Sequence, residues 1–222
     1  MLELHSINRS FGERKVLRDV SFTVTGGRMT GFVGGNGAGK TTTMRVILGV
    51  LAPDSGTLTL DGSPISVEQR TRFGYMPEER GLYPKMKIAE QIVYLGRLHG
   101  MSPAQAKAST ENLLERLGLG ERMDDTVESL SLGNQQRAQI AAALVHDPEV
   151  LVLDEPFSGL DPIAVEVVLN VLKDFAAGYA LFEVDSPDTA QRVLATALAK
   201  SPVQRFAPSQ PSLATIFKEV IK

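Results

Sequence analysis

Residues 34–41 fit the pattern G-x-x-x-x-G-K-[ST] and read Gly34-Gly35-Asn36-Gly37-Ala38-Gly39-Lys40-Thr41. The short apolar run Met29–Val33 precedes them, and a helical stretch from Lys40 to about Val50 follows. Glycines let the backbone turn tightly, so that consecutive N–H groups point inward at a chain of phosphates. The positive end of the following helix faces the same anion. Strand, loop and helix together predict the entry to an α/β sheet with a phosphate-binding loop.

Single residues of this loop have distinct expected roles. Lys40 would reach the β- and γ-phosphates of a nucleotide, and the hydroxyl of Thr41 would coordinate Mg²⁺. The alternative is a glycine-rich turn without a ligand, which the position between a strand and a helix disfavours. The expected nucleotide-binding residues of the loop are Gly35, Asn36, Gly37, Ala38, Gly39, Lys40, Thr41 and Thr42.

A second element of a phosphate site is the run Val150–Leu153 with Asp154 and Glu155 directly after it. Four successive apolar residues are typical of a strand buried on both faces of a parallel sheet. Such a strand delivers Asp154 to the carboxyl edge of the sheet, where the carboxylate can hold Mg²⁺. Glu155 is then placed to orient or deprotonate an attacking water. Without the glycine loop, the two residues would be interpreted as a solvated pair of carboxylates.

The composition is that of a globular protein. The chain has 222 residues, of which 43% are hydrophobic. Its formal net charge is −3 and it has no run of Lys or Arg, and this charge distribution argues against a nucleic-acid binder. At roughly 150 residues per domain, we expect one main domain and a small addition. Cys is absent and the 3 His lack ligand spacing, so disulfides and thiolate or imidazole metal sites are not expected. The start lacks a secretory pattern and no apolar run approaches the roughly 20 residues of a membrane span, so we expect a soluble, cytoplasmic protein.

The rest of the chain alternates between strand and helix patterns. Strand-like runs with turns, such as Leu2–Ile7 and Val20–Thr25, fill the N-terminal part and indicate short strands joined by turns. From Ile88 to about Arg137 the apolar spacing is helical, with a capping box at Ser102–Gln105.

The predicted fold class is α/β, a P-loop NTPase with a mainly parallel central sheet. The other predicted parts of the fold are an N-terminal antiparallel β subdomain, a helical insertion over about residues 87–150, and a small α+β tail. The predicted domains are residues 1–178 and, for the tail, residues 179–222. The tail is expected to read strand, helix, strand and helix, the elements being Tyr179–Val184, Pro187–Lys200, Val203–Phe206 and a helix from about Ser212.

Two further motifs carry a family resemblance. Between the two phosphate elements lies Leu130–Arg137, which reads LSLGNQQR, and Ser158–Asp161 follows the second element. With these motifs in this order, residues 1 to about 162 resemble the nucleotide-binding subunits of ABC transporters. The family signature is commonly written LSGGQ, and this chain has Leu132 for the first Gly and Asn134 for the Gln. The LSxGNQQ variant and the ending Pro211–Phe217 look like the branch of ABC exporters that pump sodium or drugs.

The resemblance implies roles for single residues. Phe11 matches the aromatic that stacks on adenine, although alone it would be interpreted as a core or turn residue. Glu78 stands where the family usually has the Gln of the loop that links the γ-phosphate to the transmembrane partner. Ser131 and Gly133 match the groups that bind the γ-phosphate of ATP held by a second copy, which suits a hydroxyl at a helix N-terminus. Asp161 matches the loop that contacts the opposite site.

The family further implies a head-to-tail homodimer with two ATP molecules between the subunits. The helical insertion matches the subdomain that docks on a membrane permease, so the expected location is the inner face of the cell membrane, without nucleic acid as a partner. The expected enzyme is an ATP hydrolase that uses ATP and Mg²⁺. Its implied catalytic residues are Glu155, Lys40 and Glu78, and its metal ligands are Thr41 and Asp154.

One part of the family pattern is missing. The family continues after the Asp161 loop to a strand that ends in a His on the γ-phosphate, and this chain has no His after His146. Either the chain carries an internal deletion, with 179–185 in the tail, or Ala180–Val184 is a degenerate form of that strand, with Asp185 or Ser186 in the place of the His. In the deletion case 179–184 could still fill the vacant place in the sheet, since an empty edge would expose unpaired backbone.

Loss of one transition-state contact costs typically 10²–10³-fold in rate, so we expect tight ATP binding with slow hydrolysis. The leading hypothesis is the ATP-binding subunit of an ABC exporter. One alternative is a truncated, hydrolysis-deficient ABC protein that binds ATP without driving transport. Another is a soluble ABC protein that acts on ribosomes or DNA, which usually has two such domains or a long coiled-coil insertion, and this chain has neither.

Overall fold

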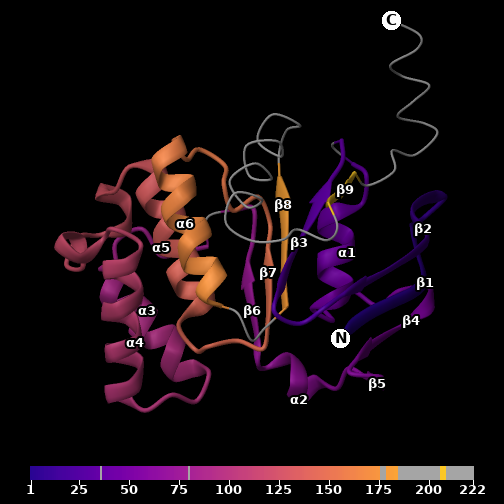
Figure 1. Ribbon diagram of the computed structural model, residues 1–222, viewed down its shortest axis with the longest axis horizontal. Helices are drawn as coiled ribbons and strands as arrows, with labels where there is room; N and C mark the ends of the chain where they lie inside the picture. Colours follow the sequence, from indigo (N-terminus) through magenta and orange to yellow (C-terminus); the bar gives the residue numbers. More distant parts are fainter. Residues whose placement is uncertain (36, 80, 176–178, 185–205, 209–222) are drawn as a thin grey trace, which may run out of the picture.

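The computed structural model describes residues 1–35, 37–79, 81–175, 179–184 and 206–208 (Figure 1). The strands are β1 (Leu2–Phe11), β2 (Arg14–Val24), β3 (Arg28–Val33), β4 (Ser55–Leu60), β5 (Ser63–Pro64), β6 (Phe73–Met76), β7 (Val150–Leu153), β8 (Tyr179–Val184) and β9 (Phe206–Pro208). The helices are α1 (Lys40–Ile47), α2 (Val67–Arg70), α3 (Ile88–Leu98), α4 (Pro103–Arg116), α5 (Leu132–Leu144) and α6 (Pro162–Asp174), with short 3-10 turns η1 (Gly120–Arg122) and η2 (Val127–Ser129). Within these ranges, none of the helices is long and apolar enough to cross a bilayer.

The strands form two sheets of different kind. An antiparallel sheet has the order β2-β1-β4-β5, and a parallel sheet has the order β6-β7-β8-β3-β9. Figure 1 shows the parallel sheet in the middle of the molecule, with α5 and α6 on one side and α3 and α4 farther out on that side. α1 and the antiparallel sheet lie on the other side. The predicted α/β class, with its N-terminal antiparallel part and helical insertion, is confirmed.

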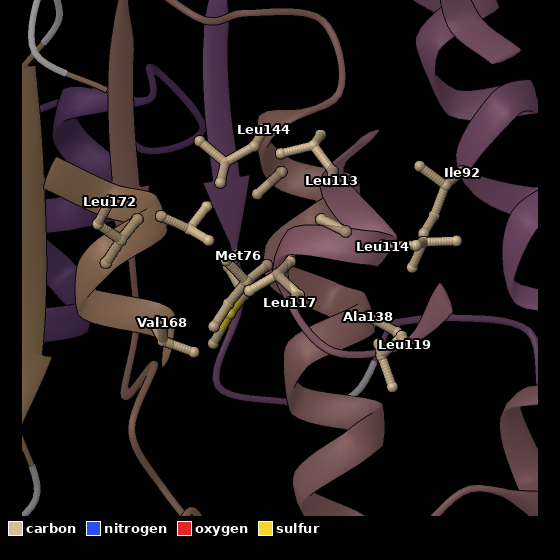
Figure 2. Close-up of a cluster of buried hydrophobic side chains, with 14 of the residues drawn as sticks. Met76, Ile92, Leu113, Leu114, Leu117, Leu119, Ala138, Leu144, Val168 and Leu172 are labelled. Carbon is tan, nitrogen blue, oxygen red and sulfur yellow. The ribbon is translucent and has the colours of Figure 1, made fainter. Parts of the chain in front are cut away.

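Strand β7 separates two hydrophobic cores. Its four residues are each 0% exposed, and successive side chains of a strand point to opposite faces. Leu151 and Leu153 accordingly join the core on the side of α3 to α6, whereas Val150 and Val152 join the core beneath α1 and β1. Figure 2 shows part of the first core, in which Met76 of β6 lies among side chains of the helices. The expectation of a strand buried on both faces is confirmed.

Helix α4 shows how local sequence sets an element. Ser102 Oγ accepts the backbone N–H of Gln105 at 3.3 Å, and Gln105 Oε1 accepts that of Ser102 at 3.1 Å, which completes the predicted capping box. Gly118 follows the helix with φ +69°, a conformation that favours glycine. The N-terminal prediction was less accurate, since β2 begins at Arg14, six residues before the predicted start at Val20.

Strand β8 occupies the place that the sequence left open. Tyr179–Val184 pairs in parallel with β7 on one side and with β3 on the other. Residues 179–184 therefore fill the place in the central sheet, a possibility that the sequence left open beside their assignment to the tail. Asp185 and Ser186, the predicted tail helices and most of the strand predicted over 203–206 lie outside the described residues. The domain boundary at residue 178 stays a prediction.

Candidate nucleotide-binding site

Three loops that follow parallel strands meet at one edge of the central sheet. The glycine loop follows β3, Glu78 comes two residues after β6, and Asp154 and Glu155 follow β7. Because these strands are parallel neighbours in the order β6-β7-β8-β3, their carboxyl ends lie at the same edge. The backbone N–H of Asp154 also donates to the carbonyl of Met76 at 2.9 Å. The structure thus places the residues of both predicted phosphate elements at the same edge of the sheet.

The turn from β3 into α1 requires glycine at residue 39. Gly39 caps α1 with φ +92°, and a Cβ on it would lie 2.6 Å from Leu17 Cδ2 and 3.3 Å from the carbonyl oxygen of Val16. The backbone N–H of Ala38 donates to the carbonyl of Gly35 at 3.1 Å and closes the loop. Strand β2 therefore packs so closely on the loop that a side chain would disturb both. Asn36, one of the predicted binding residues, lies outside the described residues.

Lys40 is buried at the start of α1, with 7% of its surface exposed. Its ammonium donates to the carbonyls of Gly34 and, at 3.1 Å, of Gly35. The charge is thus held over the loop and beside the positive end of the helix, where an anion would be attracted. Thr41 and Thr42 follow in the first turn of α1 and are both half-buried.

Asp154 is the buried carboxylate of the site. It is 1% exposed, and among the described residues neither carboxylate oxygen has a hydrogen-bond partner. A buried carboxylate in this position is destabilising unless a cation or donor compensates it. Oxygen atoms of carboxylates and hydroxyls are the ligands that Mg²⁺ prefers. The donor chemistry of Asp154 and of the Thr41 hydroxyl therefore fits a divalent cation.

Tyr75 in β6 lies within electrostatic range of the Asp154 and Glu78 carboxylates. Burial raises the pKa of the Tyr75 phenol above its ordinary value of 10.0, and the negative charges of Asp154 and Glu78 raise it further, partly opposed by Arg45. The phenol therefore stays protonated near neutral pH, and the negative charge of both carboxylates opposes its ionisation. Glu78 itself is exposed.

Glu155 has an unusual backbone conformation. Its φ is +50°, in the left-handed region that non-glycine residues seldom adopt. Gln136 of α5 donates from Nε2 to the Glu155 carbonyl at 2.9 Å, and the N–H of Ser158 donates to the same carbonyl at 3.1 Å. Strained backbone of this kind occurs preferentially at functional sites, where surrounding contacts hold it in place.

Phe11 lies at the tip of the hairpin beside the glycine loop. It pairs with Arg14 across the β1–β2 turn, and a Cβ on Gly37 would lie 3.3 Å from Arg14 Nη2. Phe11 is 49% exposed, and the Arg9 guanidinium lies 5.1 Å from the centroid of its ring. An exposed ring next to a phosphate loop can stack on a planar base.

Ser131, Gly133 and Asp161 form a separate group. Ser131 Oγ accepts the N–H of Asn134 at 3.4 Å and caps α5, and Asp161 Oδ1 accepts the N–H of Ala164 at 2.8 Å and caps α6. A Cβ on Gly133 would lie 3.5 Å from the carbonyl oxygen of Gly159, so the starts of the two helices are neighbours. Both helix N-termini point their dipoles to the same region of the surface.

Sequence reasoning missed several residues around this edge. Tyr75 and Arg14 were not predicted as site residues, because the sequence pattern of a strand does not indicate which residues lie next to it in the fold. Gln136 and Gln139 of α5 are each 5% exposed, although glutamine is usually a surface residue. The available signal was their position on the apolar face of a helix, since a polar residue there must be hydrogen-bonded.

Comparison with known proteins agrees with this geometry. Residues 17–158 match the family described as ABC transporter. Relatives include the uncharacterized ABC transporter ATP-binding protein YhaQ of Bacillus subtilis, 45% identical over 168 residues, which are 76% of this chain and 56% of YhaQ. The Nod factor export ATP-binding protein I of Paraburkholderia xenovorans is 41% identical over 179 residues, 79% of this chain and 59% of that protein. The chain therefore spans a little over half the length of these relatives.

Solved structures share the fold. One described as the ATP binding subunit of an ABC transporter is 29% identical, with a TM-score of 0.77 over 87% of this chain and 82% of that chain. A dimeric bacterial ABC transporter cassette, 21% identical, has a TM-score of 0.75 over 86% of this chain and 91% of its own. The prediction of a P-loop NTPase fold is thus confirmed. Taken with the match over residues 17–158, these likenesses show that the chain belongs to the ABC transporter family.

Proposed function

We propose that this chain binds MgATP at the carboxyl edge of its parallel sheet and acts as the ATP-binding subunit of an ABC exporter. The observation that carries the proposal is the buried Asp154 carboxylate, which has no hydrogen-bond partner among the described residues, at the edge where the glycine loop and Lys40 also lie. A fold that served only as a scaffold would gain nothing from an uncompensated carboxylate beside a phosphate-binding loop. The names of relatives such as a Nod factor export protein and a linearmycin resistance protein support the exporter assignment.

Each residue of the site has a part in the proposed reaction. The backbone N–H groups of residues 35–39 and the Lys40 ammonium would hold the phosphates, and the exposed Phe11 ring would stack on adenine. Thr41 and Asp154 would ligate Mg²⁺, which would neutralise charge on the phosphate oxygens. Glu155 would hold the attacking water and accept its proton. Glu78 would reach the γ-phosphate side of the site from the loop after β6.

The proposed active assembly is a head-to-tail dimer. Ser131 and Gly133 at the start of α5 and Asp161 at the start of α6 would face the ATP held by a second copy. Two adjacent helix N-termini, one of them with a hydroxyl, support an anion-contacting role. We further propose that helices α3 and α4 face a membrane permease, which would place the subunit on the inner face of the membrane.

Hydrolysis is expected to be slow. The family pattern places a His at the end of the strand after the Asp161 loop, and none of the residues from Asp161 to Lys222 is a His. Absence of one transition-state contact lowers a rate typically 10²–10³-fold, while the groups proposed to hold MgATP remain. A hydrolysis-deficient protein that binds ATP is therefore the second candidate.

Two experiments test this proposal. A steady-state phosphate-release assay should give turnover well below about 1 s⁻¹, the low end of ordinary enzyme rates, and turnover at or above that value would contradict the expected slow hydrolysis. Purification of the tagged chain from detergent extracts of its native membranes should recover a polytopic membrane protein. Recovery of soluble partners alone would refute the transport assignment.

A further inference from the structure

Helix α5 carries two buried glutamines on one face. Gln136 and Gln139 lie three residues apart, so their side chains are neighbours on the helix surface. Each is 5% exposed. Burial of a primary amide is unfavourable unless its N–H groups find acceptors. Both therefore need defined partners, and the partners lie outside the helix.

Both amides donate to loops of the candidate site. Gln139 Nε2 donates to the carbonyl of Pro77 at 3.0 Å and to that of Glu79 at 3.1 Å. These two carbonyls flank Glu78. Gln136 Nε2 donates at 2.9 Å to the carbonyl of Glu155. One helix face thus holds the backbone at both acidic residues proposed to act on the γ-phosphate side.

The far end of the loop after β6 is held differently. There the backbone of Tyr83 forms two hydrogen bonds with Gln91 of α3, N–H to Oε1 at 2.8 Å and Nε2–H to the carbonyl at 3.3 Å. The loop is thus attached to α3 at one end and to α5 at the other. Only the α5 end carries Glu78.

We propose that Gln139 is a positioning residue for Glu78 and acts through the carbonyls of Pro77 and Glu79. Gln136 has the corresponding role for Glu155. Because both donors belong to the helix that begins at Ser131, a displacement of that helix would carry the Ser131 end and both acidic residues along together. The inference rests on the proposed function, which gives Glu78 and Glu155 their roles in hydrolysis.

The test replaces Gln139 by Met, which has a similar length and no N–H donor. In Gln139→Met we expect single-turnover ATP cleavage to slow by about tenfold or more, since small misplacements of reacting groups have effects of this size, with the apparent ATP affinity unchanged within about twofold. The same substitution in a Glu78→Ala background should slow cleavage no further. A merely structural role would instead slow both backgrounds by the same factor, and that result would overturn the proposal.

A second readout does not depend on activity. Hydrogen exchange of the peptide over 77–83 should be faster in Gln139→Met than in the unchanged protein. The control is Ile92→Val, which removes one methyl group from the helix-side core on α3, where Ile92 is 0% exposed. The control should lower the melting temperature and leave exchange over 77–83 unchanged.

The two readouts separate this inference from the proposed function. If the unchanged protein cleaves no ATP, the proposed hydrolysis fails, and hydrogen exchange alone then decides the role of Gln139. Unchanged exchange over 77–83 in Gln139→Met would overturn the positioning role whatever the activity. Faster exchange in that variant and not in Ile92→Val would support it.

Discussion

Replacement of Asp154 by Asn tests whether the buried carboxylate is kept for a cation. The substitution preserves the shape of the side chain and removes its charge. Asp154 is 1% exposed, and neither oxygen has a hydrogen-bond partner among the described residues. A buried neutral amide without partners costs about 1–3 kcal/mol, whereas a buried ion without a partner costs several kcal/mol. We therefore expect Asp154→Asn to stabilise the nucleotide-free protein by roughly 1–3 kcal/mol.

The same substitution should abolish the stabilisation by MgATP. A ligand at 100 times its dissociation constant stabilises the folded state by about 2.7 kcal/mol. For a chain of this size, that free energy corresponds to a rise in melting temperature of about 5–11 °C. Differential scanning fluorimetry with and without MgATP measures both effects. The unchanged protein should show the rise, and Asp154→Asn should melt higher without nucleotide and respond little to it.

A matched control uses an exposed carboxylate. Asp124 pairs with Lys87 at 2.9 Å on the surface, and its side chain is 90% exposed. Asp124→Asn should keep the full response to MgATP and change the melting temperature little, because surface ion pairs contribute little. An Asp154→Asn protein that melts lower than the unchanged protein, or that keeps its response to MgATP, would refute the reasoning.

Three other substitutions address the loop, a helix cap and a histidine pair. Gly39→Ala would place a Cβ 2.6 Å from Leu17 Cδ2 at a residue with positive φ. It should therefore lower the free energy of unfolding, measured by urea denaturation, by about 2–5 kcal/mol and weaken ATP binding. An unchanged free energy of unfolding would mean that the turn is not constrained as described. Ser131→Ala removes the cap of α5, whose hydrogen bond is long at 3.4 Å, and should cost about 0.5–1 kcal/mol, with Ser129→Ala as a nearby control. Burial and the charge of His99 lower the pKa of His146 from 6.5 to about 4. Between pH 4 and pH 6.5 the unfolded chain therefore binds more protons than the folded chain, so the free energy of unfolding should fall as the pH drops from 6.5 toward 4. His146→Phe keeps a ring stacked on His99, whose ring centroid lies 3.6 Å away, and should flatten this pH dependence of the melting temperature; an unaltered dependence would exclude His146 as its source.

Local chemistry made much of the fold predictable from the sequence. The glycine loop, the four apolar residues of β7 and the capping box of α4 each depend on neighbours along the chain, and each appears as expected. The early start of β2 was missed because residues Arg14–Asp19 alternate poorly and are fixed by pairing with β1. Strand formation here depends on cross-strand contacts rather than on the pattern of the strand itself, so the pattern alone did not predict it.

The candidate site was predictable to a similar degree. Asp154 and Glu155 could be assigned to the carboxyl edge because a buried parallel strand has a defined end. The place of β8 between β7 and β3 could not be decided, since two interpretations of 179–184 fitted the same residues. The position of Gln139 in the site could not be predicted either, because the acceptors that explain its burial lie about 60 residues away in the chain. His99 and His146 had no sequence spacing that indicates a pair, yet their rings stack.

The binding of MgATP itself can be measured by isothermal titration calorimetry. We predict that the unchanged chain binds one ATP per chain, with an affinity that is clearly higher with Mg²⁺ than with a chelator, because Thr41 and Asp154 then act together with Lys40. Titration with a slowly hydrolysed ATP analogue keeps turnover from contributing heat. Absence of binding, or binding of equal strength with and without Mg²⁺, would contradict the assignment of this edge of the sheet as a MgATP site.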